Sequence, residues 1–125
     1  MTFLTVPFTK GFSNTRQLHR HYAEHGLEFG AKTVIEYETF ADTFLGAVKP
    51  PHVLECARSK GDVVRFDPTT DAYGVLDRSG IIRTYFKPLR CATVPAAQIA
   101  AMRLAGKCHD RTSNLEYFKV KCTKW

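Results

Sequence analysis

The chain lacks any long apolar segment and any sign of a specialised scaffold. In 125 residues, no apolar run approaches the roughly 20 residues that a transmembrane helix needs. Residues 1–12 lack the basic start, the apolar centre and the small-residue cleavage site of a signal peptide. There are no internal repeats and no low-complexity segments. The sequence therefore predicts a single domain over residues 1–125, either from an intracellular protein or cut from a longer protein whose export signal lay elsewhere.

Cysteine is also scarce, with four residues and no Cys-x-x-Cys pair. Cys56 falls within a predicted strand, where we expect it to be a buried small hydrophobic residue. Two of the other three, Cys91, Cys108 and Cys122, could form a disulfide if the protein works outside the cytosol. Together with His109 these three could instead bind zinc, but the missing Cys-x-x-Cys pair argues against a metal site.

Positive charge is what the chain has in excess. Its 18 Lys and Arg against 12 Asp and Glu give a formal net charge of +6. The isoelectric point is near 9.3. This balance favours a polyanionic partner such as nucleic acid, without requiring one.

Capping patterns predict two helices near the N-terminus. Asn14 with Gln17 can cap a helix that runs to about residue 25. Thr33 can cap a second helix over residues 34–46.

Turn residues predict a sheet in the middle of the chain. The four expected strands cover residues 53–59, 62–66, 73–76 and 81–87. Their short connections make neighbours antiparallel. Beyond Pro88 we expect a helix over 96–105 and one more strand over 115–121. The predicted fold is α+β, with two N-terminal helices packed on a four- to five-stranded antiparallel sheet, then a C-terminal helix and an extra strand.

The last strand of this sheet combines hydroxyl, aromatic and basic side chains. Side chains alternate along a strand, which places Ile82, Thr84 and Phe86 on one face and Ile81, Arg83, Tyr85 and Lys87 on the other. Thr84 could donate to a phosphoryl oxygen, and Tyr85 or Phe86 could stack on a base. Arg83 or Lys87 could neutralise phosphate charge, and Arg58 and Arg65 on neighbouring strands would extend the basic surface. A half-buried sheet with a charged solvent face is the alternative.

His25 is the second candidate for chemistry. It shares a predicted helix stripe with three apolar residues, Leu18, Tyr22 and Phe29. An imidazole can take a proton from a hydroxyl or give one to a leaving oxygen. The alternatives are a core histidine, or a metal site formed with His19 and His21; for these histidines a solvated helix face fits the missing third ligand better.

The two candidates together match the needs of a small ribonuclease that uses no metal. In that chemistry a base deprotonates the ribose 2′-hydroxyl, which attacks the adjacent phosphorus. An acid protonates the leaving 5′-oxygen, and cations stabilise the pentavalent phosphate. No cofactor is needed.

Three segments resemble the nuclease domains of the colicin D type, namely residues 25–30, 61–68 and 80–88. Such domains form the C-terminal part of bacteriocins, contact-dependent inhibition proteins and other polymorphic toxins. They belong to the barnase, EndoU, colicin and RelE fold group. The resemblance covers about residues 16–88 and leaves 89–125 as a C-terminal extension. It implies that His25 is the catalytic histidine. It also implies that Thr84 and Phe86 replace the strand Ser and Trp of the family.

The resemblance further implies a toxin that cleaves tRNA to a cyclic phosphate in the cytoplasm of a target bacterium, and an acidic immunity protein that covers its active site. The chain departs from the family where Tyr22 and Glu24 stand in place of lysines before the histidine. The phosphate charge would then be met by other cations, namely Arg20, Arg58, Arg65, Arg83 or Lys87.

Two alternatives stay open. In a barnase-like arrangement Glu24 or Glu28 would be the base and His25 the acid. In the other, the domain has lost its activity and binds RNA or a protein. Strict alternation separates Arg83 from Thr84, so the nuclease hypothesis requires a bulged or twisted strand or a cation from another element. It also requires His25 and Thr84 to lie within reach of one phosphate.

Overall fold

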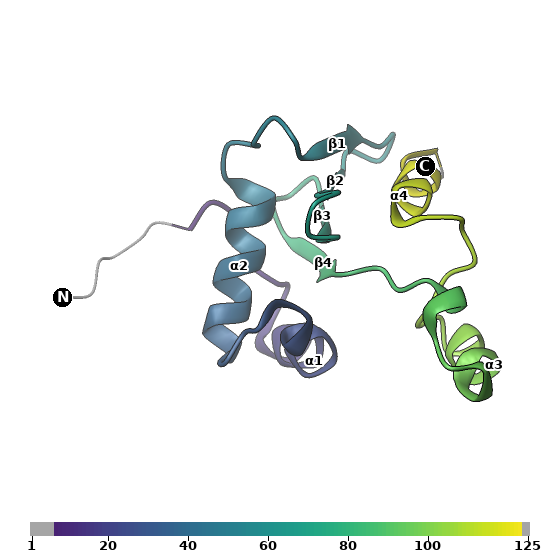
Figure 1. Cartoon of the computed structure of the whole chain (residues 1–125). Helices are drawn as coiled ribbons and strands as arrows, with labels where there is room; N and C mark the ends of the chain where they lie inside the picture. Colours follow the sequence, from purple (N-terminus) through teal and green to yellow (C-terminus); the bar gives the residue numbers. More distant parts are fainter. Residues whose placement is uncertain (1–6, 124–125) are drawn as a thin grey trace.

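A four-stranded antiparallel sheet with strand order β1-β2-β3-β4 lies between two helical layers (Figure 1). The computed structural model describes residues 7–123. The strands are β1 (Leu54–Ala57), β2 (Val63–Phe66), β3 (Tyr73–Leu76) and β4 (Ile82–Phe86). The helices are α1 (Thr15–His25), η1 (Gly26–Phe29), α2 (Val34–Gly46), η2 (Cys91–Thr93), α3 (Ala96–Leu104) and α4 (Asn114–Thr123). The α+β class and the four-strand sheet are confirmed.

Both N-terminal helices begin at the predicted caps. The Asn14 side chain accepts a hydrogen bond from the backbone N–H of Gln17 at 2.9 Å. The Thr33 hydroxyl accepts one from the N–H of Glu36 at 3.1 Å. These bonds satisfy backbone donors that a helix start otherwise leaves unpaired.

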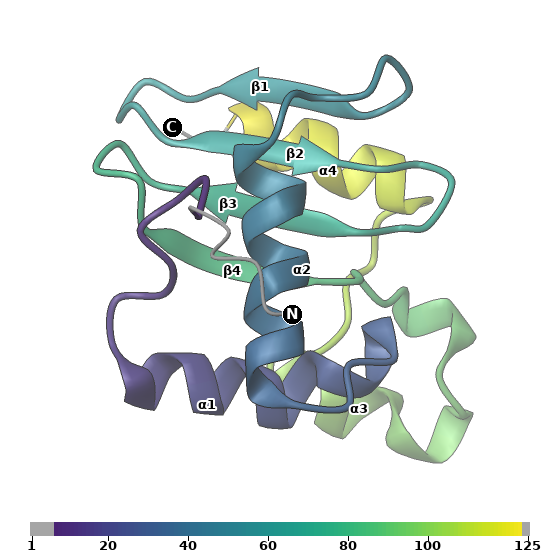
Figure 2. The same cartoon turned by 90° about the vertical axis from the view of Figure 1, so that its left-hand side faces the viewer.

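Helix α2 crosses one face of the sheet and closes a core rich in aromatic rings (Figure 2). Tyr37 is fully buried, and its hydroxyl donates to the backbone carbonyl of Tyr85 on β4. Burial raises the pKa of Tyr37 above its ordinary range. The Phe29 ring stacks on Tyr85 with 4.0 Å between ring centroids. This face therefore holds the end of α1 and the start of α2 against β4.

The predicted strand over 115–121 is wrong: these residues lie in α4, which covers the opposite face of the sheet. The Ser113 hydroxyl caps this helix by accepting from the N–H of Glu116 at 3.0 Å. Phe118 is buried against Phe66 of β2, with ring centroids 5.8 Å apart. The alternation of apolar and charged side chains around Phe118 suggested a strand. The capping box and the helical spacing of Leu115, Phe118 and Cys122 favour the helix that the chain forms.

All four cysteines form disulfides. Cys56 joins Cys122, so it ties β1 to α4 and is half-buried, which corrects its prediction as a lone buried hydrophobe. The expected disulfide within the C-terminal group is the second bridge, Cys91–Cys108. The cysteines predicted as alternative zinc ligands are therefore bonded to sulfur.

A β-bulge at Arg83 changes which side chains share a face of β4. Val75 of β3 pairs with Thr84 and Leu76 pairs with Ile82, so Arg83 has no partner across the ladder. Ile82 and Tyr85 are both buried on the α2 face, although strict alternation placed them on opposite faces. Because the bulge adds one residue, Arg83 joins Thr84 on the other face.

The N-terminal segment covers the start of β4, the edge strand. Phe12 forms a parallel bridge with Ile82, and the N–H of Ile82 donates to the carbonyl of Gly11 at 2.9 Å. Residues 1–6 lie outside the described residues. Within the described range, no helix combines the length and the apolar character needed to cross a membrane.

Candidate functional site

A cavity of about 590 Å³ lies where the end of α1 meets β4 and the C-terminal segment. We call it the histidine cavity. Its wall combines α1 and η1 side chains with β4 and the residues just after it, and with α3 and the residues that follow α3, namely Arg20, His21, Glu24, His25, Glu28, Thr84, Phe86, Lys87, Leu89, Met102, Ala105, Gly106 and Lys107. His25 and Thr84, which the sequence predicted to meet at one phosphate, share this cavity.

Two glycines set the path of the chain around His25. Gly26 is the C-cap of α1 and keeps a right-handed helical conformation, so the chain continues directly into η1. A Cβ there would lie 2.6 Å from the Tyr22 ring. Gly30 takes the left-handed conformation, with φ of 66°, and ends η1. The extra turn places Glu28 three residues after His25 on the same side.

Glu28 orients the His25 ring. Its Oε2 lies 2.7 Å from His25 Nδ1. Its Oε1 accepts a hydrogen bond from the backbone N–H of Lys87 at 2.7 Å. The carboxylate therefore accepts from Nδ1–H on one oxygen and is fixed to the end of β4 through the other.

This arrangement directs the second ring nitrogen of His25 to the cavity. With the proton on Nδ1, Nε2 carries the lone pair and can accept a proton. Glu24 Oε2 lies 3.5 Å from Nε2. His25 also stacks on Phe86, with 5.3 Å between ring centroids and 29° between planes. The imidazole is thus held by Glu28 and by the Phe86 ring, and the carboxylate at Nδ1 favours the tautomer protonated there.

A second cavity, of about 490 Å³, lies on the other side of the same β4 residues. We call it the sheet cavity. Thr84 and Phe86 line both cavities. Arg83, displaced by the bulge, lines the sheet cavity beside them, and its side chain is 62% exposed. The bulge therefore brings Arg83 to the face that carries Thr84 and Phe86, but Arg83 does not line the histidine cavity that holds His25.

Arg65 does not belong to this surface. Its guanidinium donates to Glu55 at 2.7 Å and to the carbonyls of Phe44 and Ala47 near the end of α2. The side chain is only 12% exposed and lies on the α2 face. Its predicted role in RNA binding is replaced by a structural one, because β2 points Arg65 to the face that α2 covers.

Arg58 lines the sheet cavity but is strongly held. It pairs with Asp62, and its guanidinium also donates to the carbonyl of Lys121 at 3.3 Å. The hydrogen bond from Arg58 lowers the pKa of Asp62. Because its guanidinium is bound to these protein groups, Arg58 shapes the wall of the sheet cavity.

Lys87 lies at the histidine cavity, not on the opposite face of β4. It follows the end of β4, so strand alternation no longer fixes its direction. Its Nζ lies 5.4 Å from the centre of the Phe29 ring, a cation–π distance. Lys87 therefore brings positive charge to the cavity, while its role in RNA binding stays a prediction.

His21 is buried and does not lie on a solvated helix face. It is 8% exposed, and its Nε2 lies 3.2 Å from Arg20 Nη2. Burial and then the charge of Arg20 lower its pKa from 6.5 to about 4. His21 is neutral near pH 7, and Arg20 donates to its Nε2.

The C-terminal segment completes the histidine cavity, a role that no motif in residues 89–125 predicted. None of the residues of α3 is buried, yet Met102 and the following Lys107 line the cavity. The Cys91–Cys108 disulfide closes the segment that contains α3. Lys107 adds a cation that sequence reasoning missed, since only the tertiary fold brings it near β4.

Among residues 7–123, no three side chains of His, Cys, Asp or Glu are grouped so that they could hold a metal ion. Comparison with known proteins adds no assignment, since no protein-family model and no curated protein matches the chain.

Proposed function

We propose that the protein is a metal-independent RNA endonuclease with His25 as its proton-transfer residue. The observation that carries the proposal is the His25 imidazole, oriented by Glu28 at 2.7 Å and stacked on Phe86 in a cavity that Thr84 also lines. A histidine with one nitrogen bound to a carboxylate and the other directed to a cavity is suited to general base catalysis.

In the proposed reaction His25 Nε2 takes the proton of the ribose 2′-hydroxyl. The 2′-oxygen forms a bond to phosphorus while the bond to the 5′-oxygen breaks, and water supplies a proton to the leaving oxygen. The products are a 2′,3′-cyclic phosphate and a 5′-hydroxyl. Thr84 donates to a phosphoryl oxygen, and Lys87 and Lys107 supply positive charge at the cavity wall.

For the substrate we propose single-stranded RNA, and within it a tRNA loop. A net charge of +6 supports a nucleic-acid partner. The exposed Arg83 and the Phe86 ring offer a phosphate contact and a stacking surface on one face of β4. The resemblance to colicin D-type domains supports a toxin role with an acidic immunity partner.

The test is cleavage of total tRNA by the purified domain, followed by mapping of the ends. We expect cleavage with a cyclic phosphate, insensitive to EDTA, and a loss of at least about 100-fold in rate for His25→Ala. His19→Ala, an exposed histidine on the same helix, is the matched control and should keep the wild-type rate. Intact tRNA with wild-type protein, or equal rates for His25→Ala and wild type, would refute the proposal.

A second candidate function is RNA or protein binding without catalysis. Glu24 favours it, because its carboxylate lies 3.5 Å from His25 Nε2, where a phosphate would have to approach. Replacing Glu24 by Lys separates the two. An endonuclease should cleave faster in Glu24→Lys because repulsion of the phosphate is removed. A non-catalytic domain should bind RNA more tightly and still leave it intact.

The barnase-like assignment of roles fits the same cavity. Glu24 and Glu28 both face His25, so either could be the base with His25 as the acid. Cleavage that survives His25→Ala but stops in Glu28→Ala would assign the base to Glu28.

A further inference from the structure

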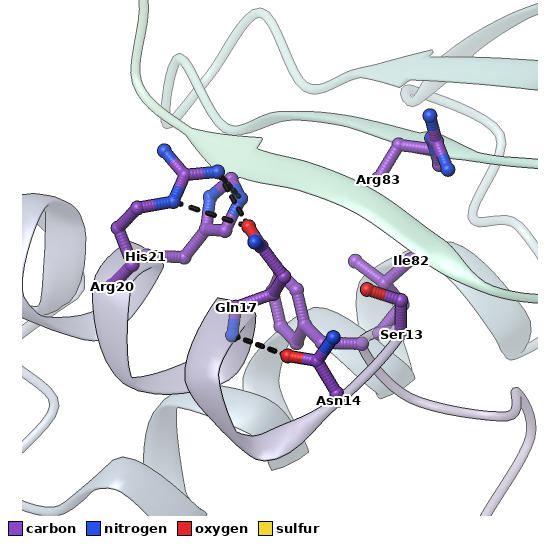
Figure 3. A pocket seen from close by; sticks show the side chains of 8 residues that line it. Ser13, Asn14, Gln17, Arg20, His21, Ile82 and Arg83 are labelled. Carbon is purple, nitrogen blue, oxygen red and sulfur yellow. Dashed lines mark hydrogen bonds between the residues drawn. The ribbon is translucent and has the colours of Figure 1, made fainter.

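A third cavity, of about 350 Å³, opens between the start of α1 and β4 (Figure 3). We call it the α1 cavity. It is lined by Phe12, Ser13, Asn14, Gln17, Arg20, His21, Ile82 and Arg83. The proposed reaction does not use this cavity, but its wall shares residues with the histidine cavity and with the sheet cavity.

The α1 cavity is positively charged and has no acidic side chain in its lining. The Gln17 side-chain oxygen accepts from Arg20 Nε at 3.1 Å and from Nη2 at 2.7 Å, which holds the Arg20 guanidinium at the rim. Arg83 lines the cavity from β4, and its guanidinium is drawn on the other side of the β4 ribbon from Arg20 (Figure 3). The cavity is thus lined by arginines from two different elements.

Both arginines are loosely paired. Arg20 lies 3.6 Å from Glu24 and Arg83 lies 3.9 Å from Asp77, with both arginine side chains more than half exposed. Exposed pairs at such distances contribute little to stability. Each guanidinium can therefore exchange its carboxylate for a phosphate at small cost. By contrast, Arg65 has a 2.7 Å pair and is nearly buried.

Shared walls connect the three cavities around β4. Arg20 and His21 line both the α1 cavity and the histidine cavity. Arg83 lines both the α1 cavity and the sheet cavity. A chain of linked phosphates could therefore occupy the histidine cavity and continue into the α1 cavity without leaving the basic surface.

The polar groups of the α1 cavity suit a sugar–phosphate chain. The Asn14 oxygen is used by the helix cap, which leaves its amide N–H₂ to donate, and Ser13 supplies an exposed hydroxyl. His21 is buried in the wall, and its Nδ1 has no hydrogen-bond partner among the described residues.

We propose that the α1 cavity is a subsite for the phosphodiester next to the one that is cut, with Arg20 and Arg83 as its phosphate contacts. This inference rests on the proposed function and adds to it a substrate requirement. The protein needs at least two consecutive phosphodiesters of a single RNA strand for full affinity. The His25 region binds one and the α1 cavity binds the neighbour.

Gln17→Glu tests the subsite with little structural change. The carboxylate keeps the oxygen that accepts from Arg20, but it adds a negative charge to the cavity. Gln98→Glu on α3 is the matched control, since Gln98 is exposed and lines none of the three cavities. The probes are 2′-O-methyl uridine oligonucleotides, which cannot be cut, in a dinucleotide with one phosphodiester and a tetranucleotide with three.

We expect Gln17→Glu to weaken tetranucleotide binding about fivefold, the effect of about 1 kcal/mol of repulsion between unit charges at contact distance. Dinucleotide binding should stay within twofold of wild type, and Gln98→Glu should change neither. Arg83→Gln should lower the salt dependence of tetranucleotide binding by about one phosphate contact. Equal weakening of both probes, no weakening of either, or no binding of the tetranucleotide by wild type would overturn the subsite.

The binding assay separates this inference from the proposed function. A wild-type protein that leaves tRNA intact yet shows the length-dependent loss in Gln17→Glu would refute cleavage and keep the phosphate subsite. A wild-type protein that cuts tRNA, with Gln17→Glu binding like wild type, would refute the subsite alone.

Discussion

The two faces of the sheet are covered by different means and to different extents. On the first face, α2 and the end of α1 bury a continuous apolar core that includes Ile82 and Tyr85 of β4. On the second face, α4 packs on β2 and β3 around Phe118 and is held to β1 by the Cys56–Cys122 disulfide. Figure 1 shows the sheet between these two layers.

The difference explains where the candidate site lies. Helix α4 leaves Arg83 of β4 exposed, and Thr84 and Phe86 open to the cavities. Phe86 stacks on His25 at the end of α1, and Thr84 shares the histidine cavity with both. A complete core on one face provides rigidity, while incomplete cover on the other leaves polar side chains open to a ligand. Three changes test this contrast, in order of expected effect.

The largest effect should come from releasing α4. Replacing Cys56 and Cys122 by Ser removes a cross-link between residues 66 positions apart, so the unfolded chain gains conformational freedom. We expect the free energy of unfolding to fall by about 4 kcal/mol. Urea unfolding of the oxidised double variant against wild type measures it. A loss below about 1 kcal/mol would mean that packing around Phe118 alone holds the second face.

The next effect concerns the buried histidine beside the open site. The pKa of His21 is about 4 in the folded protein and 6.5 when unfolded, so only the unfolded state gains this proton as pH falls from 6.5 to 4. The free energy of unfolding should therefore fall by about 3 kcal/mol across this window and stay independent of His21 above it.

The comparison of His21→Leu with wild type isolates this contribution, because other groups titrate equally in both. The stability difference between the two proteins should change with pH between 6.5 and 4. A constant difference would show that His21 titrates alike in both states.

The smallest of the three effects concerns the orientation of His25. In Glu28→Gln the amide oxygen can still accept from the N–H of Lys87, which turns the amide N–H₂ to His25 Nδ1. Nδ1 must then accept, so the ring proton moves to Nε2 and the proposed base is lost.

We expect RNA cleavage by Glu28→Gln to fall about 100-fold, or about 2.7 kcal/mol in the activation barrier, with unfolding by urea little changed. Glu116→Gln on α4 is the control and should cleave like wild type. A rate within threefold of wild type would show that Glu28 does not set the tautomer.

Much of the fold could be predicted because its signals are local. The caps at Asn14 and Thr33 and the turns between strands are read within a few residues, and the structure confirms them. The strand predicted around Phe118 was wrong because the apolar residues of so short a stretch fit both the period of a strand and the period of a helix. The burial of Phe118 against β2 is compatible with the helix.

The candidate site could be predicted only in part. His25 and Thr84 were singled out by residue type, and they do line one cavity. The faces of Arg83 and Arg65 were not predictable. No residue in this strand indicates where a bulge will form, and the groups that bind the Arg65 guanidinium lie on other elements.

The sequence by itself determined the two N-terminal helices and the four strands that follow them, the excess of positive charge and the side chains capable of proton transfer and phosphate contact. The tertiary structure decided which of those side chains meet. The bulge turned Arg83 toward Thr84, η1 brought Glu28 to His25, and the disulfides placed the C-terminal segment over β1 and beside the cavity. The reason is physical: local hydrogen bonds set an element's type, but long-range packing sets which of its faces is buried.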